Sequence, residues 1–207
     1  MSITINELMA AATVIPVLTV EDLDKAAPLA LALSRGGLRV IEMTLRTPDA
    51  LKAMRLMKEA APGLIIGMGT IRTPGQIADS LAAGAEFLVS PGLPEGLVMP
   101  LRNAGIPVLP GVATATEAMA AVDAGFEVLK FFPAEPAGGI PYLNALRGPL
   151  PDIRFCPTGS ISREAAPRYL ALRNVACVGG SWIVSPEALA RSDWDVITEN
   201  ARAAAAM

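Results

Sequence analysis

The sequence of 207 residues contains no histidine, and this absence excludes several kinds of active site. A Ser-His-Asp triad, a Cys-His pair, a histidine proton shuttle and a zinc site with imidazole ligands all need that residue. Acid–base chemistry must come from carboxylates, lysine, tyrosine, cysteine or water. The two cysteines, Cys156 and Cys177, form no C-x-x-C pair. We therefore expect both to be small buried residues in strands, with no metal and no other cofactor.

Charge is also scarce, at 18% of the residues with a net charge of -3. Without a run of basic residues, a nucleic-acid partner is not expected. No apolar stretch reaches about 18 residues free of proline, glycine and charge, so we expect no membrane partner. The first residues lack the basic segment and apolar core of a signal peptide, which favours a cytoplasmic protein. Hydrophobic residues make up 52% of the chain, which excludes disorder and suggests surface that copies of the chain cover.

What the chain does have is a regular alternation of short apolar strands with Ala- and Leu-rich helical segments. Such alternation predicts a parallel sheet, and eight units in about 200 residues predict a (β/α)8 TIM barrel, α/β in class. We expect one domain over residues 1–207, with an extra N-terminal helix from residues 5–13 covering the bottom of the barrel. An open doubly wound sheet is the alternative, but the first strand lacks the glycine-rich motif that usually follows. The expected strands are 14–20, 39–46, 64–71, 86–92, 107–113, 127–135, 153–161 and 175–184.

Three helices are predicted to begin at a hydroxyl residue followed by proline. These pairs are Thr47-Pro48, Thr73-Pro74 and Ser185-Pro186. The hydroxyl can accept a hydrogen bond from a free N–H group, and proline suits the first helical turn.

Lys130 is the most informative polar residue, because it stands inside the apolar strand segment E-V-L-K-F-F-P. The other three lysines, Lys25, Lys52 and Lys58, fall in helical segments. A lysine is almost never buried without a reason, and burial disfavours its charged form. A neutral amine in an apolar pocket suits Schiff-base formation with a carbonyl compound. The alternative is a structural ion pair with a carboxylate in the barrel.

Glu42 and Arg46 lie on the second expected strand, in V-I-E-M-T-L-R. Because side chains alternate along a strand, Glu42, Thr44 and Arg46 share one face, which we expect to point into the barrel. Glu42 would then transfer protons, and Arg46 would bind a substrate carboxylate. The alternative is a Glu42–Arg46 salt bridge.

Small residues end three further strands. In G-M-G-T, residues 67–70, two glycines would let a ligand approach and Thr70 would offer a hydroxyl group; the alternative is tight packing. P-T-G-S (157–160) and G-G-S (179–181) end the seventh and eighth strands, where barrel enzymes commonly bind phosphate. Backbone N–H groups exposed by small residues can cradle an anion.

Together, V-I-E-M-T-L-R-T-P, G-M-G-T, F-L-V-S-P-G, L-P-G-V-A-T-A-T-E, L-K-F-F-P-A-E, F-C-P-T-G-S-I and V-G-G-S-W resemble the 2-keto-3-deoxy-6-phosphogluconate (KDPG) aldolases. These are class I aldolases of the Entner–Doudoroff pathway, and the resemblance covers essentially the whole chain. It implies a homotrimeric (β/α)8 barrel that cleaves this phosphorylated keto acid to pyruvate and glyceraldehyde 3-phosphate.

The resemblance also implies residue roles. Lys130 would form the Schiff base and Glu42 would accept and donate protons. Arg46 and Thr70 would hold the pyruvate carboxylate, and Thr158 would influence stereoselectivity. Phosphate would lie near the two loops that end the last strands, at Gly159, Ser160, Gly180 and Ser181. This chain departs from the family at Ser160, where a second glycine is usual, which bears on phosphate binding and not on the Schiff base.

Other functions stay open at this point. A related aldolase could act on the galactonate epimer or on 4-hydroxy-2-oxoglutarate. A phosphate-binding isomerase or epimerase would lack a covalent step and would form no pyruvate adduct. A barrel that only binds phosphosugars is disfavoured by the presence of Lys130, Glu42 and Arg46 together, since binding alone needs no neutral amine.

Overall fold

The computed structural model describes residues 3–207 of the chain, so the first two residues of the N-terminal segment lie outside the described residues. It is an α/β fold in which every strand pairing is parallel. Strands occur at all eight predicted places, each shorter than expected. They are β1 Val14–Leu18, β2 Val40–Thr44, β3 Ile65–Gly69, β4 Leu88–Val89, β5 Val108–Leu109, β6 Gly111–Val112, β7 Val128–Phe131, β8 Arg154–Pro157 and β9 Val178–Gly180.

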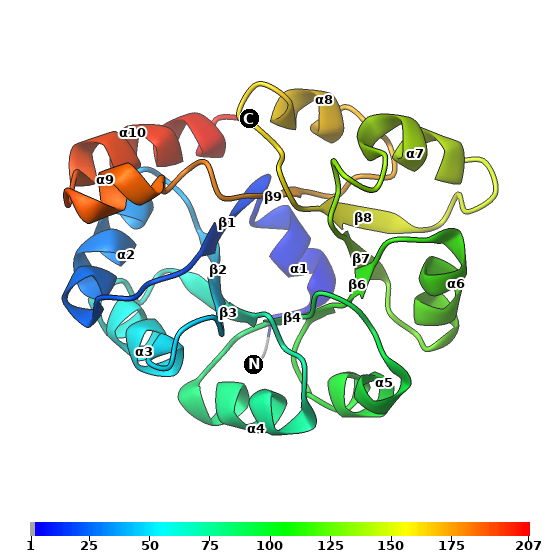
Figure 1. The fold of residues 1–207 in the computed structure, drawn as a ribbon, viewed down its shortest axis with the longest axis horizontal. Helices are drawn as coiled ribbons and strands as arrows, with labels where there is room; N and C mark the ends of the chain where they lie inside the picture. The colour runs from blue at the N-terminus through cyan, green and yellow to red at the C-terminus, as the bar shows by residue number, and fades with distance from the viewer. Residues whose placement is uncertain (1–2) are drawn as a thin grey trace.

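The strands form a six-stranded sheet in the order β5-β4-β3-β2-β1-β9 and a three-stranded sheet in the order β6-β7-β8. Pro110 separates β5 from β6, because proline has no N–H group to donate to a neighbouring strand. Its carbonyl still accepts a hydrogen bond from the N–H of Lys130 at 2.9 Å. An isolated bridge joins Thr158 to Gly179, between β8 and β9. The parallel strands therefore follow one another in a curled arrangement, which Figure 1 shows from one end.

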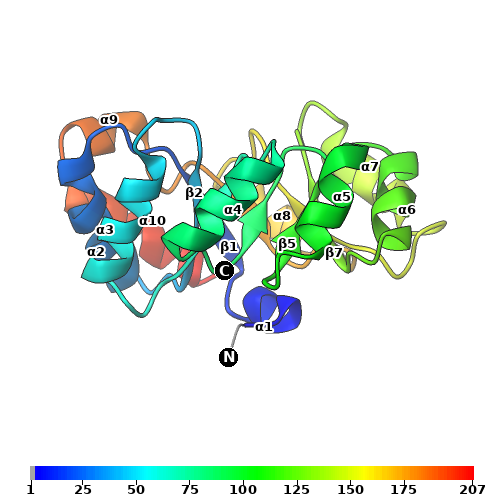
Figure 2. The same cartoon turned by 90° about the horizontal axis from the view of Figure 1, so that it is seen from below.

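Helices surround the strands, and α1 lies across the middle of the ring in this view (Figure 1). Turning the molecule shows α1 projecting beneath the layer that the other helices form (Figure 2). The helices are α1 Ile5–Ala10, the short 3-10 helix η1 Leu23–Lys25, α2 Ala26–Arg35, α3 Ala50–Ala60, α4 Pro74–Ala83, α5 Glu95–Arg102, α6 Ala115–Asp123, α7 Gly139–Leu146, α8 Ala166–Leu170, α9 Pro186–Ala190 and α10 Trp194–Ala205.

Two of the three predicted helix starts are confirmed. The hydroxyl of Thr73 accepts a hydrogen bond from the N–H of Gln76 at the start of α4, and the hydroxyl of Ser185 does the same for Ala188 in α9. The prediction for Thr47 was wrong. Its hydroxyl donates instead to the carbonyl of Val20 at 3.1 Å, and α3 begins only after Asp49. The Thr47 hydroxyl, which the local sequence predicts as a helix cap, therefore binds a residue distant in the sequence instead.

The core divides into two apolar clusters. The larger one lies between the strands and the outer helices, and includes Leu29, Met54 and Ile66. The smaller one joins Leu8 and Met9 of α1 to strand side chains, Phe87 and Cys177 among them. Both cysteines are buried, as predicted, and both are free; Cys156 lies in β8, but Cys177 directly precedes β9 rather than lying in a strand. Within residues 3–207, no helix combines the length and apolar character needed to cross a membrane.

Candidate active site

Lys130 lies in the middle of β7 and is 5% exposed. Its Nζ is 3.3 Å from Oε1 of Glu42 and 5.3 Å from the centre of the Phe132 ring. The other lysines are engaged at the surface, where Lys52 and Lys58 form ion pairs with acidic side chains. Lys130 is thus the one buried lysine among residues 3–207, as predicted, and the ion pair with a carboxylate that was the alternative for it is present too.

Glu42 reaches Lys130 from β2, across the interior of the curled sheet. Every residue of β2 is buried, and Glu42 is 4% exposed. A Cβ built on Gly69, at the end of the neighbouring strand β3, would overlap the carboxylate of Glu42. The missing side chain at Gly69 therefore provides the space in which the carboxylate lies. An ion pair so deeply buried is costly to desolvate, and such pairs are often kept for a chemical role.

Arg46 lies two residues beyond the end of β2 and makes no ion pair among the described residues. The predicted alternative, a Glu42–Arg46 salt bridge, is contradicted, because Glu42 pairs with Lys130. Arg46 does not reach Glu42 because β2 ends at Thr44, before Arg46, and the Arg46 side chain lines a cavity instead. A guanidinium without a protein partner is available to bind a carboxylate.

A cavity of about 180 Å³ gathers several of the predicted binding residues. It combines the Arg46 side chain with the ends of β8 and β9, two elements far away in sequence. Phe132, which lies over the Lys130 amine, forms part of its wall and so connects the cavity to the buried pair. Its lining is Val17, Arg46, Phe132, Thr158, Gly159, Ser160, Ile161, Gly179 and Ser181.

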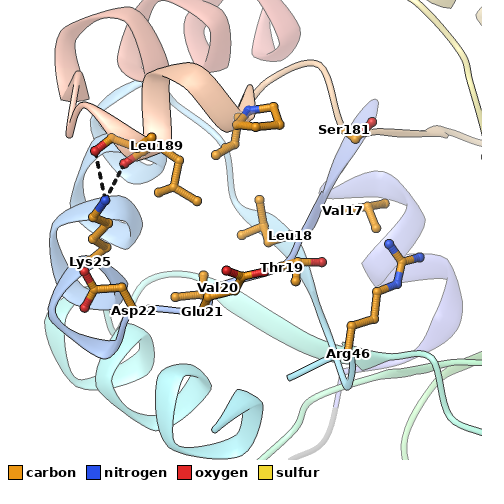
Figure 3. A pocket seen from close by; sticks show the side chains of 13 residues that line it. Val17, Leu18, Thr19, Val20, Glu21, Asp22, Lys25, Arg46, Ser181 and Leu189 are labelled. Atoms are coloured by element: carbon orange, nitrogen blue, oxygen red, sulfur yellow. Dashed lines mark hydrogen bonds between the residues drawn. The ribbon is translucent and has the colours of Figure 1, made fainter. Parts of the chain in front are cut away.

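A larger cavity of about 480 Å³ adjoins the first, and the two share Val17, Arg46 and Ser181. It opens between the end of β1, η1 and α9. Figure 3 shows Arg46 and Ser181 on one side of it and Lys25 with Leu189 on the other. The ammonium group of Lys25 donates to the carbonyls of Leu189 and Ala190, both at 3.0 Å. Lys25 thus holds η1 against the end of α9.

The loop after β8 has an unusual backbone at the position where the chain departs from the family. Gly159 has φ 114°, and Ser160 has φ 59°, in the left-handed region that favours glycine. Ser160 carries a Cβ there, at a cost of roughly 1–2 kcal/mol.

Thr158, just before the loop, packs closely against Gly179, where a Cβ would overlap the threonine hydroxyl. Gly180 faces the Trp182 ring and does not line the cavity.

Thr70 follows β3 and has φ 65°, but it lines neither cavity. The expectation that the glycines of G-M-G-T make room for a ligand was wrong for both of them. A Cβ at Gly67 would overlap the ring of Phe87, and one at Gly69 would overlap Glu42. Side chains of the protein fill both spaces, so the packing alternative holds.

Sequence reasoning gave no part in the site to Val17, Thr19, Phe132 or Cys156. Cys156 is the register partner of Lys130 in the neighbouring strand. Interaction with the neighbouring Cys177 thiol lowers the pKa of the Cys156 thiol, and the nearby charge of Lys130 acts in the same direction. The same interaction, together with burial, raises the pKa of the Cys177 thiol. If the register between β1 and β2 had been known, it would have pointed to Val17, because Val17 lies opposite Glu42.

The described part of the chain holds no group of three or more cysteine and acidic side chains placed to bind a metal ion. The site brings an amine and a carboxylate into contact. These two groups adjoin a cavity with a free guanidinium at one side and exposed loop backbone at the other.

Comparison with known proteins gives a consistent result. The family model described as KDPG and KHG aldolase matches residues 5–200. The 2-dehydro-3-deoxy-phosphogluconate aldolase of Dickeya dadantii is 47% identical over 201 residues, covering 97% of this chain and 94% of that protein. The KHG/KDPG aldolase of Escherichia coli K12 is 45% identical over 199 residues, covering 96% and 93%.

A solved structure is equally similar. The KDPG aldolase of Legionella pneumophila superimposes with a TM-score of 0.93 at 48% identity, covering 96% of each chain. In that crystal structure, pyruvate was captured at low pH as a covalent carbinolamine intermediate.

Proposed function

The chain belongs to the KDPG and KHG aldolase family, and we propose on this premise that Lys130 is its Schiff-base residue. The enzyme is a class I aldolase that reversibly cleaves 2-keto-3-deoxy-6-phosphogluconate to pyruvate and glyceraldehyde 3-phosphate. The observation that carries the proposal is the contact between the buried Lys130 amine and the Glu42 carboxylate, at 3.3 Å. A carboxylate at this distance can take a proton from the ammonium and leave the amine free to attack.

The reaction begins when the Lys130 nitrogen attacks the C2 carbonyl carbon of the substrate. The carbinolamine that forms loses its hydroxyl group as water, using the proton that Glu42 took from the ammonium, to give an iminium ion and the Glu42 carboxylate. Glu42, directly or through a water molecule, removes the proton of the C4 hydroxyl. The C3–C4 bond then breaks, its electron pair moves toward the iminium to form an enamine, and the aldehyde leaves.

Glu42 next returns a proton to C3 of the enamine, and water releases pyruvate from Lys130. One carboxylate thus performs both proton transfers, which is economical in a protein without histidine. The iminium withdraws electrons from the bond that breaks, a task that a metal ion performs in other aldolases. No cofactor enters this sequence of steps.

The binding residues surround this chemistry. The free guanidinium of Arg46 holds the carboxylate of the keto acid, with help from Thr70 just beyond β3. Thr158 lies between Cys156 and the phosphate loop and contacts the C4 side of the substrate. Phosphate lies at the loops after β8 and β9, at Gly159, Ser160, Gly180 and Ser181. Support comes from the cavity that Arg46, Thr158, Gly159, Ser160 and Ser181 line together.

A second candidate substrate is 4-hydroxy-2-oxoglutarate, and the 6-phosphogalactonate epimer is a third. The name of the Escherichia coli relative, KHG/KDPG aldolase, favours the second. The free Arg46 could hold the C1 carboxylate of any of these acids. Comparing kcat/KM for the three compounds separates the candidates.

At the level of the whole molecule, the curled sheet closes as a (β/α)8 barrel of one domain, with α1 as an extra helix against its bottom. The bridge between Thr158 and Gly179 and the hydrogen bond from Lys130 to Pro110 support closure. The enzyme acts as a cytoplasmic homotrimer. Exposed apolar side chains support association, since Met99 is 62% and Met119 59% exposed.

The proposal is tested by reducing the enzyme with borohydride in the presence of pyruvate. Peptide mass spectrometry should find the pyruvate-derived label on Lys130 and not on Lys25, Lys52 or Lys58. The matched control is Lys130→Arg, which keeps the positive charge but forms no imine. Label spread over the other lysines, or cleavage activity surviving in Lys130→Arg, would refute the assignment.

A further inference from the structure

The hydroxyl of Thr19 lies at the end of β1, in the larger cavity that adjoins the site. Val17 and Leu18 are the register partners of Glu42 and Met43, so the next step of the strand sets Thr19 beside Thr44. Their two hydroxyl oxygens are 2.9 Å apart. Because side chains alternate, Thr19 projects to the same side of the sheet as Val17 and Glu42.

The direction of the hydrogen bond between the two threonines follows from the partner of Thr44. The Thr44 hydroxyl is fully buried and donates its only proton to the carbonyl of Leu18 at 2.8 Å. A hydroxyl has one donor and two acceptor positions, so Thr44 can only accept from Thr19. Thr19 therefore donates its own hydroxyl proton to Thr44. Toward the cavity, its oxygen can only accept a hydrogen bond.

Thr19 shares the lining of the larger cavity with Arg46 and Ser181, and Figure 3 labels all three. The proposed function places the carboxylate end of the substrate on Arg46 and the phosphate end near Ser181. The atoms between these two ends then pass the cavity wall to which Thr19 belongs. Two of those atoms carry hydroxyl groups, C4 and C5. The C4 hydroxyl gives its proton to Glu42, which leaves the C5 hydroxyl as the donor for Thr19.

We infer that Thr19 determines specificity by accepting a hydrogen bond from the C5 hydroxyl, which is the 2-hydroxyl of the aldehyde product. This inference rests on the proposed function. It predicts that the enzyme distinguishes aldehydes that carry a hydroxyl next to the carbonyl carbon from those that do not. In the direction of synthesis, the preferred partner of pyruvate is thus a 2-hydroxyaldehyde phosphate.

The test measures condensation of pyruvate with glyceraldehyde 3-phosphate and with its 2-deoxy analogue, 3-oxopropyl phosphate. The quantity of interest is the ratio of kcat/KM for the two aldehydes. In Thr19→Val, which has nearly the same shape, this ratio should fall about 2- to 13-fold, the range expected for one neutral hydrogen bond. Thr19→Ser keeps the oxygen and should preserve most of the ratio.

Thr47→Val is the matched control, because Thr47, like Thr19, donates its hydroxyl proton within the protein, here to the carbonyl of Val20, but it lines neither cavity. Its ratio should equal that of the wild type. If Thr19→Val lowers kcat/KM for both aldehydes equally, or for neither, the inference is refuted. Failure of the proposed function would look different, since wild-type enzyme would then form no pyruvate adduct on Lys130.

Discussion

At the scale of single residues, the site depends on a carboxylate and an amine that have no other charged partner. Among the described residues, Glu42 and Lys130 pair with each other alone. Each is buried, so removing either charge leaves the other without compensation, which makes the pair a sensitive place for substitution.

Replacing Glu42 by glutamine should lower kcat for cleavage by about 10²–10⁴-fold, the usual contribution of general acid–base catalysis. Glutamine keeps the shape and removes the base. Pyruvate trapping on Lys130 should largely survive, because water can take the ammonium proton in place of Glu42 during the incubation, whereas cleavage of the C3–C4 bond loses its base. Steady-state kinetics and borohydride trapping measure the two effects separately. Turnover at the wild-type level in Glu42→Gln would show that another group moves the proton.

Ser160→Gly should increase the free energy of unfolding by roughly 1–2 kcal/mol, because glycine adopts the observed φ of 59° without a Cβ clash. Denaturant titration measures this change. The substitution also removes a hydroxyl but keeps the backbone N–H that we assign to phosphate. We therefore expect kcat/KM for the phosphorylated substrate to change by less than about tenfold, mainly through KM.

Turnover of an unphosphorylated analogue should barely respond to Ser160→Gly. An equal change for both substrates would mean that Ser160 shapes the site around the Schiff base, and that phosphate lies elsewhere.

At the scale of elements, the end of β3 controls the position of a side chain on β2. Gly69 to Ala adds a methyl group where the Glu42 carboxylate now lies. The displaced carboxylate can no longer contact Lys130 in the same geometry, and activity should fall on the order of 10²-fold, as expected for a misplaced catalytic group. Far-ultraviolet circular dichroism should show that the fold persists.

The control for this variant is Gly96→Ala in α5, where no atom lies within 4 Å of a built Cβ. It should leave kcat and KM unchanged and stabilise the helix by roughly 0.5–1 kcal/mol. Full activity in Gly69→Ala would contradict the role given to that strand end.

The link between α8 and the segment after β7 should make stability depend on alkaline pH. Tyr169 of α8 donates a hydrogen bond to Oε1 of Glu135 at 2.7 Å. Burial, then this hydrogen bond, raises the pKa of Tyr169 above the ordinary value. A raised pKa means that the unfolded chain loses its proton first, so the stabilisation is complete below a pH of about 10 and declines above it.

Unfolding by denaturant between pH 9 and 11 measures this dependence. Tyr169→Phe should be less stable at neutral pH and should show a weaker decline toward alkaline pH. The prediction would be wrong if the two proteins lost stability in parallel.

At the scale of the whole molecule, the apolar surface sets an expectation for assembly. Large apolar side chains remain exposed on several outer helices, including Met99 on α5, Met119 on α6 and Val196 on α10. Sedimentation velocity should give a particle of three times the chain mass of 21.5 kDa. A mass of 21.5 kDa at every concentration would contradict the proposed homotrimer.

The sequence by itself determined the order of strands and helices and the chemical character of the site. Short apolar runs rich in Val, Ile, Leu and Phe between helical segments are typical of strands buried on both faces, so the eight strand positions could be predicted. Lys130 stood out because its neighbours were all apolar. The absence of histidine left Glu42 as the natural proton carrier.

Only the tertiary structure decided which groups meet. Glu42 and Lys130 are 88 residues apart, and no local pattern says that they pair while Arg46 stays free. The same holds for Gly69, whose missing Cβ leaves space for the Glu42 carboxylate of the neighbouring strand. It also holds for Thr47, whose hydroxyl donates to the distant carbonyl of Val20 instead of capping a helix. Local rules assign each residue its propensity, but a hydrogen bond or ion pair forms with whichever partner the curled sheet brings within about 3 Å. That selection belongs to the three-dimensional packing, because distances between strands that are far apart in the sequence are set by how the curled sheet packs around its core.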